Sequence, residues 1–541
     1  MISRLDDLVP TALRREWAAD GTCPDLDLYA LFRAHRCTTP DRVAVIDGLG
    51  VLTYAELDRL VRSTAVGLRG IGVCEGDVVA VQLPNGRAAV LVDLALAALG
   101  AVALPFPAGR GRTEALSLLR RSGARAVIAA VEHRGTAHAR ELVEAAPELP
   151  WLRAVVAVGP GETPPEATPW AEIVGADGRT FVPDRPDPDG AARILVSSGS
   201  EAEPKMVAYS HNALAGGRGN FVATLLDDGA PPRCLFLVPL ASAFGSNGTA
   251  VTLARHGGCL ILLDHFSPTA ALTAIRDHRP THVLAVPTMI RIMLDRLSEA
   301  LPPMTALVLG GSQLDEATAR EAREAFGCPV VNLYGSADGV NCHTGLVETA
   351  PDSSGPGVIV GFPDPRVAEI RIDPVPDEVV ADGVGEIVAR GPMTPMCYVG
   401  APELNTRYRT ADGWVRTGDL GLLGDDGRLR LVGRLKQVVI RGGANISPAE
   451  VETVLAVHPK VRDVVCVGVP DPLMGERLAA CVVPRPGRTP DLADLTAHLT
   501  RHGVDRGKHP EHLLLLAELP LTPAGKPDRE TLRTHLLREK R

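Results

Sequence analysis

Short apolar runs alternate with helical patterns over more than half of the chain, from about Val43 to Val331. Parallel strands need long crossover connections, which helices usually supply, so this alternation predicts parallel sheets covered by helices. The expected strands are residues 78–83, 126–131, 193–197, 234–239, 259–263, 282–286 and 306–309. The expected helices are residues 86–99, 211–226, 268–279, 288–300 and 315–326. The pattern therefore predicts an α/β fold built on stacked, mostly parallel sheets.

The character of the chain changes twice after this region. Residues 351–384 are rich in Pro, Asp and Gly, which predicts a small, loop-rich β region that continues to about residue 432. Beyond Gly433, short strands and helices alternate over about 100 residues and predict a separate α+β unit. A helix is expected to open at Ser447, because Pro448 and Glu450 complete the pattern of a capping box. We therefore expect an N-terminal domain (1–433), with its β-rich part at 351–432, and a C-terminal domain (434–541).

Composition excludes several classes of function. The chain has 541 residues, of which 45% are hydrophobic and 22% charged, as in ordinary soluble proteins. The formal net charge of -9 argues against a nucleic-acid-binding surface. The ten cysteines contain no C-x-x-C pair, and reduced thiols in a cytoplasmic protein account for them best. The N-terminus has no signal-peptide pattern, and Asp93, Gly100 and Pro105 interrupt the most apolar stretch, so we expect no membrane span.

One loop has the composition of a phosphate-binding turn. An expected strand at 193–197 leads into a segment rich in Ser and Gly that ends at Lys205. Small residues let backbone N–H groups converge on phosphate oxygens, and a lysine adds a positive charge. Only six of the 56 basic residues are lysines, so a lysine in this place is notable. A plain turn between a strand and a helix is the alternative on this segment alone.

Motifs spread over nearly the whole chain, about residues 40–530, resemble the adenylate-forming superfamily of acyl-CoA synthetases, luciferases and adenylation domains. They occur in the order typical of that superfamily. They are LTYAELDRLV (52–61), GVCEGDVVAVQLPN (72–85), GAVALPFPAG (100–109), VLGGSQL (308–314), NLYGSADG (332–339), WVRTGDLG (414–421), GRLKQVVIRGGANISPAEVE (433–452), GVPDPLMGE (468–476) and PLTPAGKPDR (520–529).

The resemblance implies a two-step reaction. A carboxylate attacks the α-phosphate of ATP to give acyl-AMP and pyrophosphate, and a thiol then attacks the acyl-AMP. It also implies a large N-terminal domain and a small, mobile C-terminal lid that rotates between the two steps. The expected small molecules are a carboxylic acid or its adenylate, ATP, CoA and Mg²⁺.

The resemblance assigns roles to residues in these motifs. Asp419 and Arg434 are expected to bind the ribose, and Lys526 to be the catalytic lysine that offsets charge during adenylation. Lys436 is expected to be the hinge of the lid. The remaining nucleotide-binding residues are expected to contact adenine or to let the ligand approach the backbone, and two further glycines to line the CoA tunnel. These residues are Asn332, Tyr334, Gly335, Gly310 and Gly311 for the nucleotide, and Gly442 and Gly443 for the tunnel.

The sequence departs from the family pattern in the phosphate loop. That loop usually reads S-G-T-T-G-x-P-K-G, whereas here it contains Ser198, Gly199, Ser200, Glu201 and Glu203 before Pro204 and Lys205. Ionised carboxylates cannot donate hydrogen bonds, and two like charges ~4 Å apart repel by about 4 kcal/mol at an effective dielectric of 20. This repulsion would act on the terminal phosphates of ATP and would largely spare AMP. Alternatively, both glutamates point to solvent.

Two further motifs depart from the pattern. Ala337 replaces the threonine that holds the AMP phosphate in relatives, and Asp338 replaces the longer glutamate that binds magnesium. Ser242 stands where a histidine commonly gates the acyl and thiol groups, and its small neighbours suggest room for a bulky acyl group. Ser242 and Ala337 are thus expected to form the acyl and thiol gate.

Two enzymatic interpretations remain open. The protein is either a conventional ATP-dependent carboxylate–CoA ligase or an enzyme specialised for joining preformed acyl-AMP to CoA, which the departures favour. The second case calls for a separate adenylating enzyme as a partner. The chain shows no carrier-protein domain, so the acceptor is expected to be free CoA or a separate carrier protein. A catalytically inactive homologue is a third interpretation, which the retained Asp419, Arg434, Lys436 and Lys526 disfavour.

Overall fold

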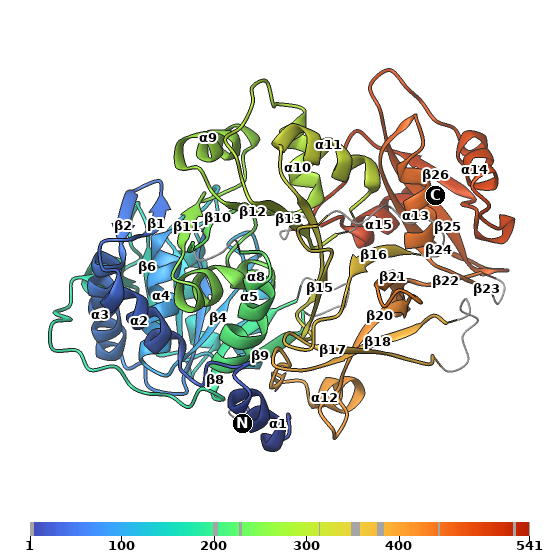
Figure 1. The fold of residues 1–541 in the computed structure, drawn as a ribbon. Helices are drawn as coiled ribbons and strands as arrows, with labels where there is room; N and C mark the ends of the chain where they lie inside the picture. The colour runs from blue at the N-terminus through green and yellow to red at the C-terminus, as the bar shows by residue number, and fades with distance from the viewer. Residues whose placement is uncertain are drawn as a thin grey trace.

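The structure is a computed structural model that describes residues 5–197, 204–226, 230–312, 314–347, 357–375, 383–441, 444–522 and 526–539. The described strands form four sheets, and helices cover the first two of them (Figure 1). The predicted α/β class is confirmed. The phosphate-loop residues Ser198, Gly199, Ser200, Glu201 and Glu203 and the tunnel glycines Gly442 and Gly443 lie outside the described residues.

The first sheet has the order β15-β14-β13-β12-β10-β11-β1-β2, and all of its inner pairs from β14 to β1 are parallel. Only the edge pairs, β14–β15 and β1–β2, are antiparallel. The strands are β1 (Val43–Asp47), β2 (Gly50–Thr53), β10 (Arg233–Phe236), β11 (Cys259–Leu262), β12 (His282–Ala285), β13 (Ala306–Gly310), β14 (Val330–Ser336) and β15 (Val340–His343).

The second sheet has the order β19-β9-β8-β4-β3-β5-β6-β7 and is parallel from β8 to β7. β8 and β9 are antiparallel, so the predicted phosphate loop connects two strands and not a strand and a helix. The strands are β3 (Val78–Gln82), β4 (Val102–Pro105), β5 (Ala126–Ala130), β6 (Ala154–Val158), β7 (Thr168–Pro169), β8 (Ala191–Val196), β9 (Met206–Ser210) and β19 (Cys397–Tyr398).

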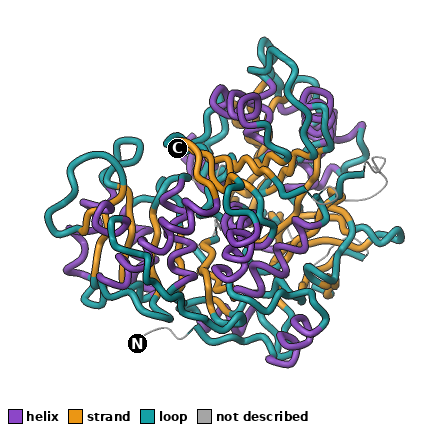
Figure 2. The backbone as a smooth tube through the Cα atoms, turned by 60° about the vertical axis from the view of Figure 1, so that its left-hand side comes forward, coloured by secondary structure: helices purple, strands orange, loops and turns teal. Residues whose placement is uncertain are grey.

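A shared layer of helices packs between these two sheets. The largest core cluster joins Val45 of the first sheet and Val79 of the second to Leu96 and Val251 in the helices between them. Figure 2 shows the helices gathered among the strands of this part of the molecule. The helices of the layer are α2 (Leu28–Thr38), α3 (Tyr54–Gly70), α4 (Arg87–Ala98), α8 (Gly219–Ala223) and two π-helices, η2 (Ala213–Arg218) and η4 (Gly248–Arg255).

The outer faces of the two sheets are covered by separate helices. Two further core clusters lie there, one on each sheet. The helices over the second sheet are α5 (Arg112–Ser122) and α6 (His138–Ala145), which the short η1 (Ala146–Glu148) follows. The short α7 (Trp170–Val174) instead packs on α3, on the inner side of the sheet. The helices over the first sheet are α9 (Pro268–His278), α10 (Pro287–Leu294) and α11 (Glu316–Phe326).

The third and fourth sheets are smaller and lie beside each other at the right of Figure 1. The third is antiparallel, in the order β16-β21-β20-β18-β17, and falls within the predicted β-rich segment. Its strands are β16 (Val358–Gly361), β17 (Glu369–Asp373), β18 (Gly385–Arg390), β20 (Val415–Leu423) and β21 (Leu429–Arg434), and α12 (Pro402–Tyr408) precedes β20.

The fourth sheet is formed only by residues after the third. Its strands are β22 (Val439–Arg441), β23 (Ala444–Ile446), β24 (Val461–Asp471), β25 (Gly475–Pro484) and β26 (His512–Leu515). Its helices are α13 (Pro448–Ala456), α14 (Leu492–Arg501), η6 (Arg506–Lys508) and α15 (Arg529–Glu539). The short 3₁₀-helix η5 (Leu435–Gln437), which contains Lys436, connects the third sheet to the fourth.

One local prediction, the capping box at Ser447, is wrong. Ser447 precedes α13 as expected, but its hydroxyl donates to the Val432 carbonyl at 2.9 Å and does not cap the helix. Glu450 instead pairs with Lys508 at 2.8 Å, so no capping box forms. The expected helix 211–226 is confirmed over residues 211–223, where it is a π-helix continued by a short α-helix, and Gly217 packs directly on Met393: a Cβ there would lie 2.3 Å from the Met393 Cα.

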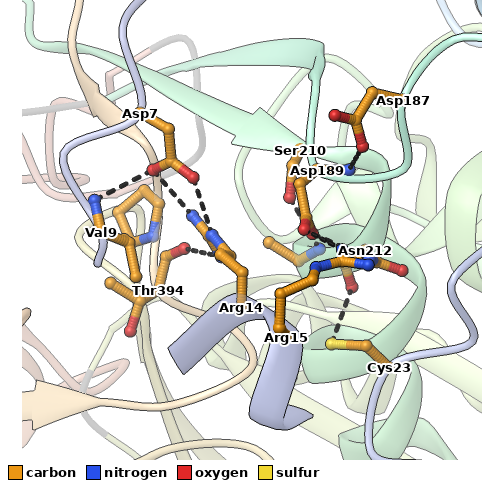
Figure 3. A network of polar contacts seen from close by, with 12 residues as sticks. Asp7, Val9, Arg14, Arg15, Cys23, Asp187, Asp189, Ser210, Asn212 and Thr394 are labelled. Atoms are coloured by element: carbon orange, nitrogen blue, oxygen red, sulfur yellow. Dashed lines mark hydrogen bonds and ion pairs between the residues drawn. The ribbon is translucent and has the colours of Figure 1, made fainter. Parts of the chain in front are cut away.

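The N-terminal segment fixes the beginning of η2 (Figure 3). The Arg14 guanidinium, on α1 (Thr11–Ala19), donates to Asp7 at 2.9 Å and to the Thr394 carbonyl at 3.1 Å. The Asn212 amide, directly before η2, donates to Asp189 at 2.8 Å, and the Asn212 carbonyl accepts the Cys23 thiol at 3.8 Å. These contacts hold both the start of η2 and the segment on which it packs.

Candidate active site

A cavity of about 440 Å³ lies where the first sheet, the third sheet and the C-terminal unit meet. Its walls include Leu333 and residues 335–338 at the end of β14, residues 416–419 of β20, Arg434 of β21 and Lys526. Ligands in α/β proteins bind beyond the carboxyl ends of parallel strands, and β13 and β14 end at this cavity.

Most of the predicted site residues that the structure describes line this cavity, although they come from distant parts of the chain. They are Lys205, Ser242, Gly311, Gly335, Ala337, Asp338, Asp419, Arg434 and Lys526. Gly310, Asn332 and Tyr334 are not among its lining residues. Lys436 lies in η5 between Leu435 and Gln437, which both line the cavity.

Asp419 is buried and holds two neighbours together. Its Oδ2 accepts the Tyr334 hydroxyl at 2.8 Å, and its Oδ1 lies 2.8 Å from the Arg434 Nε. Burial, together with the Asp419 charge, raises the pKa of Tyr334 well above its ordinary value, so this phenol stays a donor. A carboxylate accepts about four hydrogen bonds, so each Asp419 oxygen keeps capacity for a ribose hydroxyl.

Tyr334 and Asn332 lie differently from what the motif suggested. The Tyr334 ring packs in a core cluster with Val340, Cys342 and residues of the third sheet. The Asn332 amide donates to the Ile359 carbonyl at 3.1 Å, and its backbone N–H donates to the Thr344 hydroxyl at 3.0 Å. In this arrangement both side chains support the cavity wall from behind.

Asp338 is enclosed by protein donors. Its Oδ1 accepts the Tyr398 hydroxyl at 2.7 Å and lies 3.4 Å from the Lys205 Nζ, and its Oδ2 accepts the Ser336 hydroxyl at 2.7 Å. Tyr398 and Tyr408 also face Lys205, whose Nζ lies 5.4 Å and 4.2 Å from their ring centres. The charges of Lys205 and Asp338 therefore compensate each other within one polar cluster.

This cluster does not fit a magnesium site. Magnesium prefers several oxygen ligands in octahedral geometry, whereas Asp338 is the single carboxylate of this cluster of described residues and a cation lies beside its Oδ1. Within the described residues, no three His, Cys, Asp or Glu side chains gather in a way that could hold a metal. Asp338 as found is thus a partner of Lys205 and not a metal ligand.

Lys526 reaches the cavity from the C-terminal end of the chain. Its Cε lies 3.5 Å from the point that a Cβ on Gly311 would occupy, so the lysine stem crosses this glycine closely. Gly311 has a φ of +86°, which also favours glycine. Burial, together with the nearby Arg434 charge, lowers the pKa of Lys526 to about 8. An ammonium group in this position can neutralise charge on a bound carboxylate or phosphate.

Hydrogen bonds fix the positions of Ser242 and Ala337, the two small residues predicted to form the acyl and thiol gate. The Ser242 hydroxyl donates to the Pro239 carbonyl at 2.7 Å and accepts the Gly245 N–H at 2.9 Å, where the 3₁₀-helix η3 (Gly245–Asn247) begins. Both functions of this hydroxyl are used, so Ser242 contributes space and not a catalytic group. The Ala337 carbonyl accepts the Tyr209 hydroxyl at 2.9 Å.

The cavity wall is electropositive. Among the described residues that line it, seven are basic and three are acidic. Asp419, Glu386 and Asp338 each pair with one of these cations, at 2.8, 3.0 and 3.4 Å. The excess of positive charge suits anionic ligands such as phosphates and carboxylates.

Sequence reasoning missed several polar residues of the wall. Arg218, Asn247 and Asn341 line the cavity and are buried, and Tyr398 holds Asp338. Arg218 carried one signal that could have been noticed: it is a charged residue inside the otherwise apolar helical pattern 211–226. The other three had no signal in the sequence, because their role depends on contacts with distant residues.

Known proteins share this architecture. The model of the AMP-binding enzyme family matches residues 32–399, and that of the AMP-binding enzyme C-terminal domain matches residues 450–526. The chain is 35% identical over 503 residues to triostin synthetase I of Streptomyces triostinicus, with 91% of each chain covered. It is 32% identical over 513 residues to 2-hydroxy-7-methoxy-5-methyl-1-naphthoate–CoA ligase of Streptomyces carzinostaticus, covering 91% of this chain and 90% of that one.

A solved structure agrees with these relatives. Amide bond synthetase McbA from Marinactinospora thermotolerans superposes with a TM-score of 0.80 and 27% identity, over 94% of this chain and 99% of that one. None of the described helices of the present chain combines the length and apolar character needed to span a bilayer. The chain therefore belongs to the AMP-binding enzyme family, within the adenylate-forming superfamily, and is an acid–thiol ligase of that superfamily.

Proposed function

We propose that the protein forms acyl-CoA thioesters from acyl-adenylates and that it is specialised for this second half-reaction, with weak adenylation. The observation that carries the proposal is the enclosure of Asp338 by Lys205, Tyr398 and Ser336. The first half-reaction would use Asp338 as a carboxylate for magnesium and Lys205 as a cation for phosphate. In this structure these two side chains pair with each other. Glu201 and Glu203 add negative charge to the loop where the terminal phosphates of ATP would lie.

The second half-reaction needs none of these groups. The CoA sulfur attacks the acyl carbonyl, a carbon–sulfur bond forms, and the bond to the phosphate oxygen breaks and releases AMP. Acyl-AMP carries a single phosphate, so it escapes most of the repulsion that the loop exerts on ATP. A separate adenylating enzyme would then supply the acyl-AMP.

We propose the following roles for the cavity residues. Asp419 and Arg434 bind the ribose, since their side chains meet at the cavity wall. Gly311 and Gly335 line the cavity and, having no side chain, let the nucleotide approach the backbone. Lys526 neutralises charge at the carboxylate and phosphate.

We further propose that residues 434–541 act as a mobile lid that turns at Lys436. Support comes from the fourth sheet, whose strands all follow η5, and from the short connection that η5 makes to the third sheet. In the lid position seen here, Lys526 faces the cavity. After rotation, Gly442 and Gly443 would line the path of the CoA thiol.

The proposed acceptor is free CoA, as in the relative named as a naphthoate–CoA ligase. A separate carrier protein is the alternative acceptor. Incubation with one acyl-AMP and either CoA or a panel of carrier proteins distinguishes them by the mass of the thioester product.

A conventional two-step carboxylate–CoA ligase is the second candidate. Lys526 favours it, because the lid position that brings this lysine to Gly311 is the one that adenylation needs. In that case Glu201 and Glu203 point away from the nucleotide.

Pyrophosphate exchange decides between the two candidates. We expect the wild-type protein to show little acid-dependent ATP–pyrophosphate exchange and to consume synthetic acyl-AMP with CoA much faster. Replacing Glu201 by Thr and Ala202 and Glu203 by Gly should raise ATP affinity if the loop limits it. Exchange by the wild type at an ordinary enzymatic rate, on the order of 1 per second or more, contradicts the specialisation and leaves the conventional ligase.

A further inference from the structure

Arg218 is a buried cation in the cavity wall that has no acidic partner among the residues that the structure describes. It is 2% exposed, and its Nη1 donates to the Ala243 carbonyl at 3.0 Å. Its Nη2 lies 3.4 Å from the Tyr209 hydroxyl, and the guanidinium stacks on the Tyr209 ring with its Cζ 5.0 Å from the centre. All of these partners are neutral, and within the described part of the chain the Arg218 Nε has no hydrogen-bond partner. A buried charge normally has a counter-ion, because removal from water is costly.

Two more unpartnered polar atoms belong to the same wall. The Asn341 Nδ2 and the Asn247 Oδ1 are buried and lack partners, and both residues line the cavity with Arg218. Asn247 lies beside Arg218, because their side chains donate to the carbonyls of the adjacent residues Phe244 and Ala243. Asn341 lies on β15 opposite Gly335, near the turn whose Ala337 carbonyl accepts the Tyr209 hydroxyl. Arg218, Asn247 and Asn341 thus line neighbouring parts of the cavity wall, and each has a buried polar atom without a hydrogen-bond partner among the described residues.

The wall at Arg218 and Asn247 is distinct from the proposed nucleotide position. Asp419, Arg434 and Lys526 are supplied by the third sheet and the C-terminal unit. Arg218 and Asn247 are supplied by η2 and η3, in the helical layer between the two large sheets, where Ser242 and Ala243 leave space. A ligand group at Arg218 thus belongs to the acyl part of the substrate.

Arg218 also differs from the other cations of the wall. Arg434, Arg416 and Lys205 each pair with an acid that also lines the cavity. Arg110 pairs with Glu114. Arg407 is exposed to solvent, which screens its charge. Only Lys526 shares the lack of a close acidic partner among the described lining residues, and its proposed partner is the substrate.

We infer that the acyl substrate carries a second acidic group besides its reacting carboxylate, and that Arg218 binds this group as an anion, with Asn341 as a second donor. The inference rests on the proposed function. An anionic oxygen would accept N–H groups of the Arg218 guanidinium and the Asn341 amide, whose unpartnered atoms are buried in the wall and would turn toward it. Charge-assisted bonds of this kind are the strong ones. The Asn247 Oδ1 would accept a hydroxyl or acid proton beside it.

The experiment measures binding of unreactive acyl-sulfamate analogues of acyl-AMP by calorimetry. The acyl groups are benzoyl, hydroxybenzoyl and carboxybenzoyl, the last two with the substituent at each ring position. We expect the best carboxybenzoyl analogue to bind wild type at least tenfold more tightly than the benzoyl analogue. We expect Arg218→Met to abolish this preference, and Arg218→Lys to retain part of it.

Two controls separate recognition from folding. Arg110→Met removes a lining arginine that already has an acidic partner, so it should leave the carboxybenzoyl-to-benzoyl ratio unchanged. The melting temperature of Arg218→Met should equal or exceed that of wild type, because an apolar side chain replaces an uncompensated buried charge. A lower melting temperature with equal loss for all analogues would mean a structural role and overturn the inference.

The remaining outcomes are also distinct. Equal binding of benzoyl and carboxybenzoyl analogues by wild type overturns the inference alone. Preference for a hydroxybenzoyl analogue with rejection of every carboxybenzoyl analogue overturns the claim that the group is an anion. Failure of wild type to bind any analogue, or AMP itself, contradicts the proposed function and not the recognition at Arg218.

Discussion

At the scale of single residues, the cavity is organised by which charges are already paired. Asp338 and Lys205 are paired with each other, and Asp419 is paired with Arg434. Among the described lining residues, buried Arg218 and half-buried Lys526 have no close acid, whereas the remaining cation without one, Arg407, is exposed to solvent. Paired groups stabilise the site in the absence of ligand, whereas unpaired ones gain most when an anion binds. The unpaired cations therefore indicate where substrate charge is recognised.

The charge of Lys526 should control nucleotide binding at alkaline pH. The pKa of Lys526 is lowered to about 8, so its ammonium charge is lost as the pH rises through that value. We expect AMP to bind about three- to tenfold more weakly at pH 9.5 than at pH 7.5. Lys526→Arg keeps its charge over this range and should bind AMP with little pH dependence. Calorimetric titration with AMP measures both, and equal pH profiles for the two proteins would contradict the role of Lys526.

At the scale of elements, one ion pair joins the C-terminal unit to the helices over the first sheet. Arg291 of α10 lies 2.6 Å from Asp463 of β24, and both side chains are more than half buried. The Ser447 hydroxyl adds a hydrogen bond to the Val432 carbonyl, between α13 and β21. The chain passes from the third sheet to the fourth through η5, and these contacts hold the C-terminal unit in the position that keeps Lys526 in the cavity.

Removal of the ion pair should loosen the lid. An ion pair of this exposure contributes up to about 1 kcal/mol, which is roughly a fivefold change in an equilibrium. We expect Arg291→Ala and Asp463→Ala each to speed amide exchange in Leu435–Gln437 and around Lys526 by two- to fivefold, with no larger effect in the double variant. Hydrogen exchange with mass spectrometry measures this.

Arg296→Ala is the matched control for the ion pair. Arg296 is an exposed arginine just after α10, and it should leave exchange in η5 unchanged. Unchanged exchange in both single variants of the pair, or fully additive effects in the double variant, would show that Arg291 and Asp463 do not hold the lid together.

At the scale of the whole molecule, the charge of the chain and the charge of the cavity have opposite signs. The chain has a formal net charge of -9, yet basic residues outnumber acidic ones on the described cavity wall by seven to three. Focused positive potential in a cleft raises the local concentration of anionic substrates, and salt screens it. Acyl-AMP and CoA are both anions, so their capture should depend on this field.

The second-order rate constant kcat/KM should therefore fall as salt is added. Between 50 and 500 mM NaCl we expect a several-fold decrease of kcat/KM for acyl-AMP with CoA, with a smaller change in kcat. Arg416→Ser, in the cavity wall, should flatten this dependence. Arg179→Ser removes the same charge from an exposed position that is not among the lining residues and should not flatten it. A rate constant that is flat or rises with salt in wild type would contradict the electrostatic capture.

Local sequence patterns determined most of the fold. The strands expected at 126–131, 259–263 and 306–309 and the helices expected at 86–99 and 315–326 all form within one or two residues of their predicted bounds. Such elements depend on neighbouring residues, on apolar spacing and on caps such as Asp315, which accepts the Thr318 N–H at 2.8 Å. The motifs also determined the family, because they record which residue types follow one another.

Only the tertiary structure decided which side chains of the site contact one another. The Tyr398 hydroxyl donates to Asp338, which lies 60 positions away in the sequence. The Ser447 hydroxyl donates to the Val432 carbonyl and does not cap its own helix. Tyr334 packs into the core, and its hydroxyl donates to Asp419. None of these contacts leaves a pattern in the sequence, because each depends on the backbone placement of segments that are distant along the chain. For the same reason the sequence contained Arg218 without showing that it would be buried at the cavity without a counter-ion.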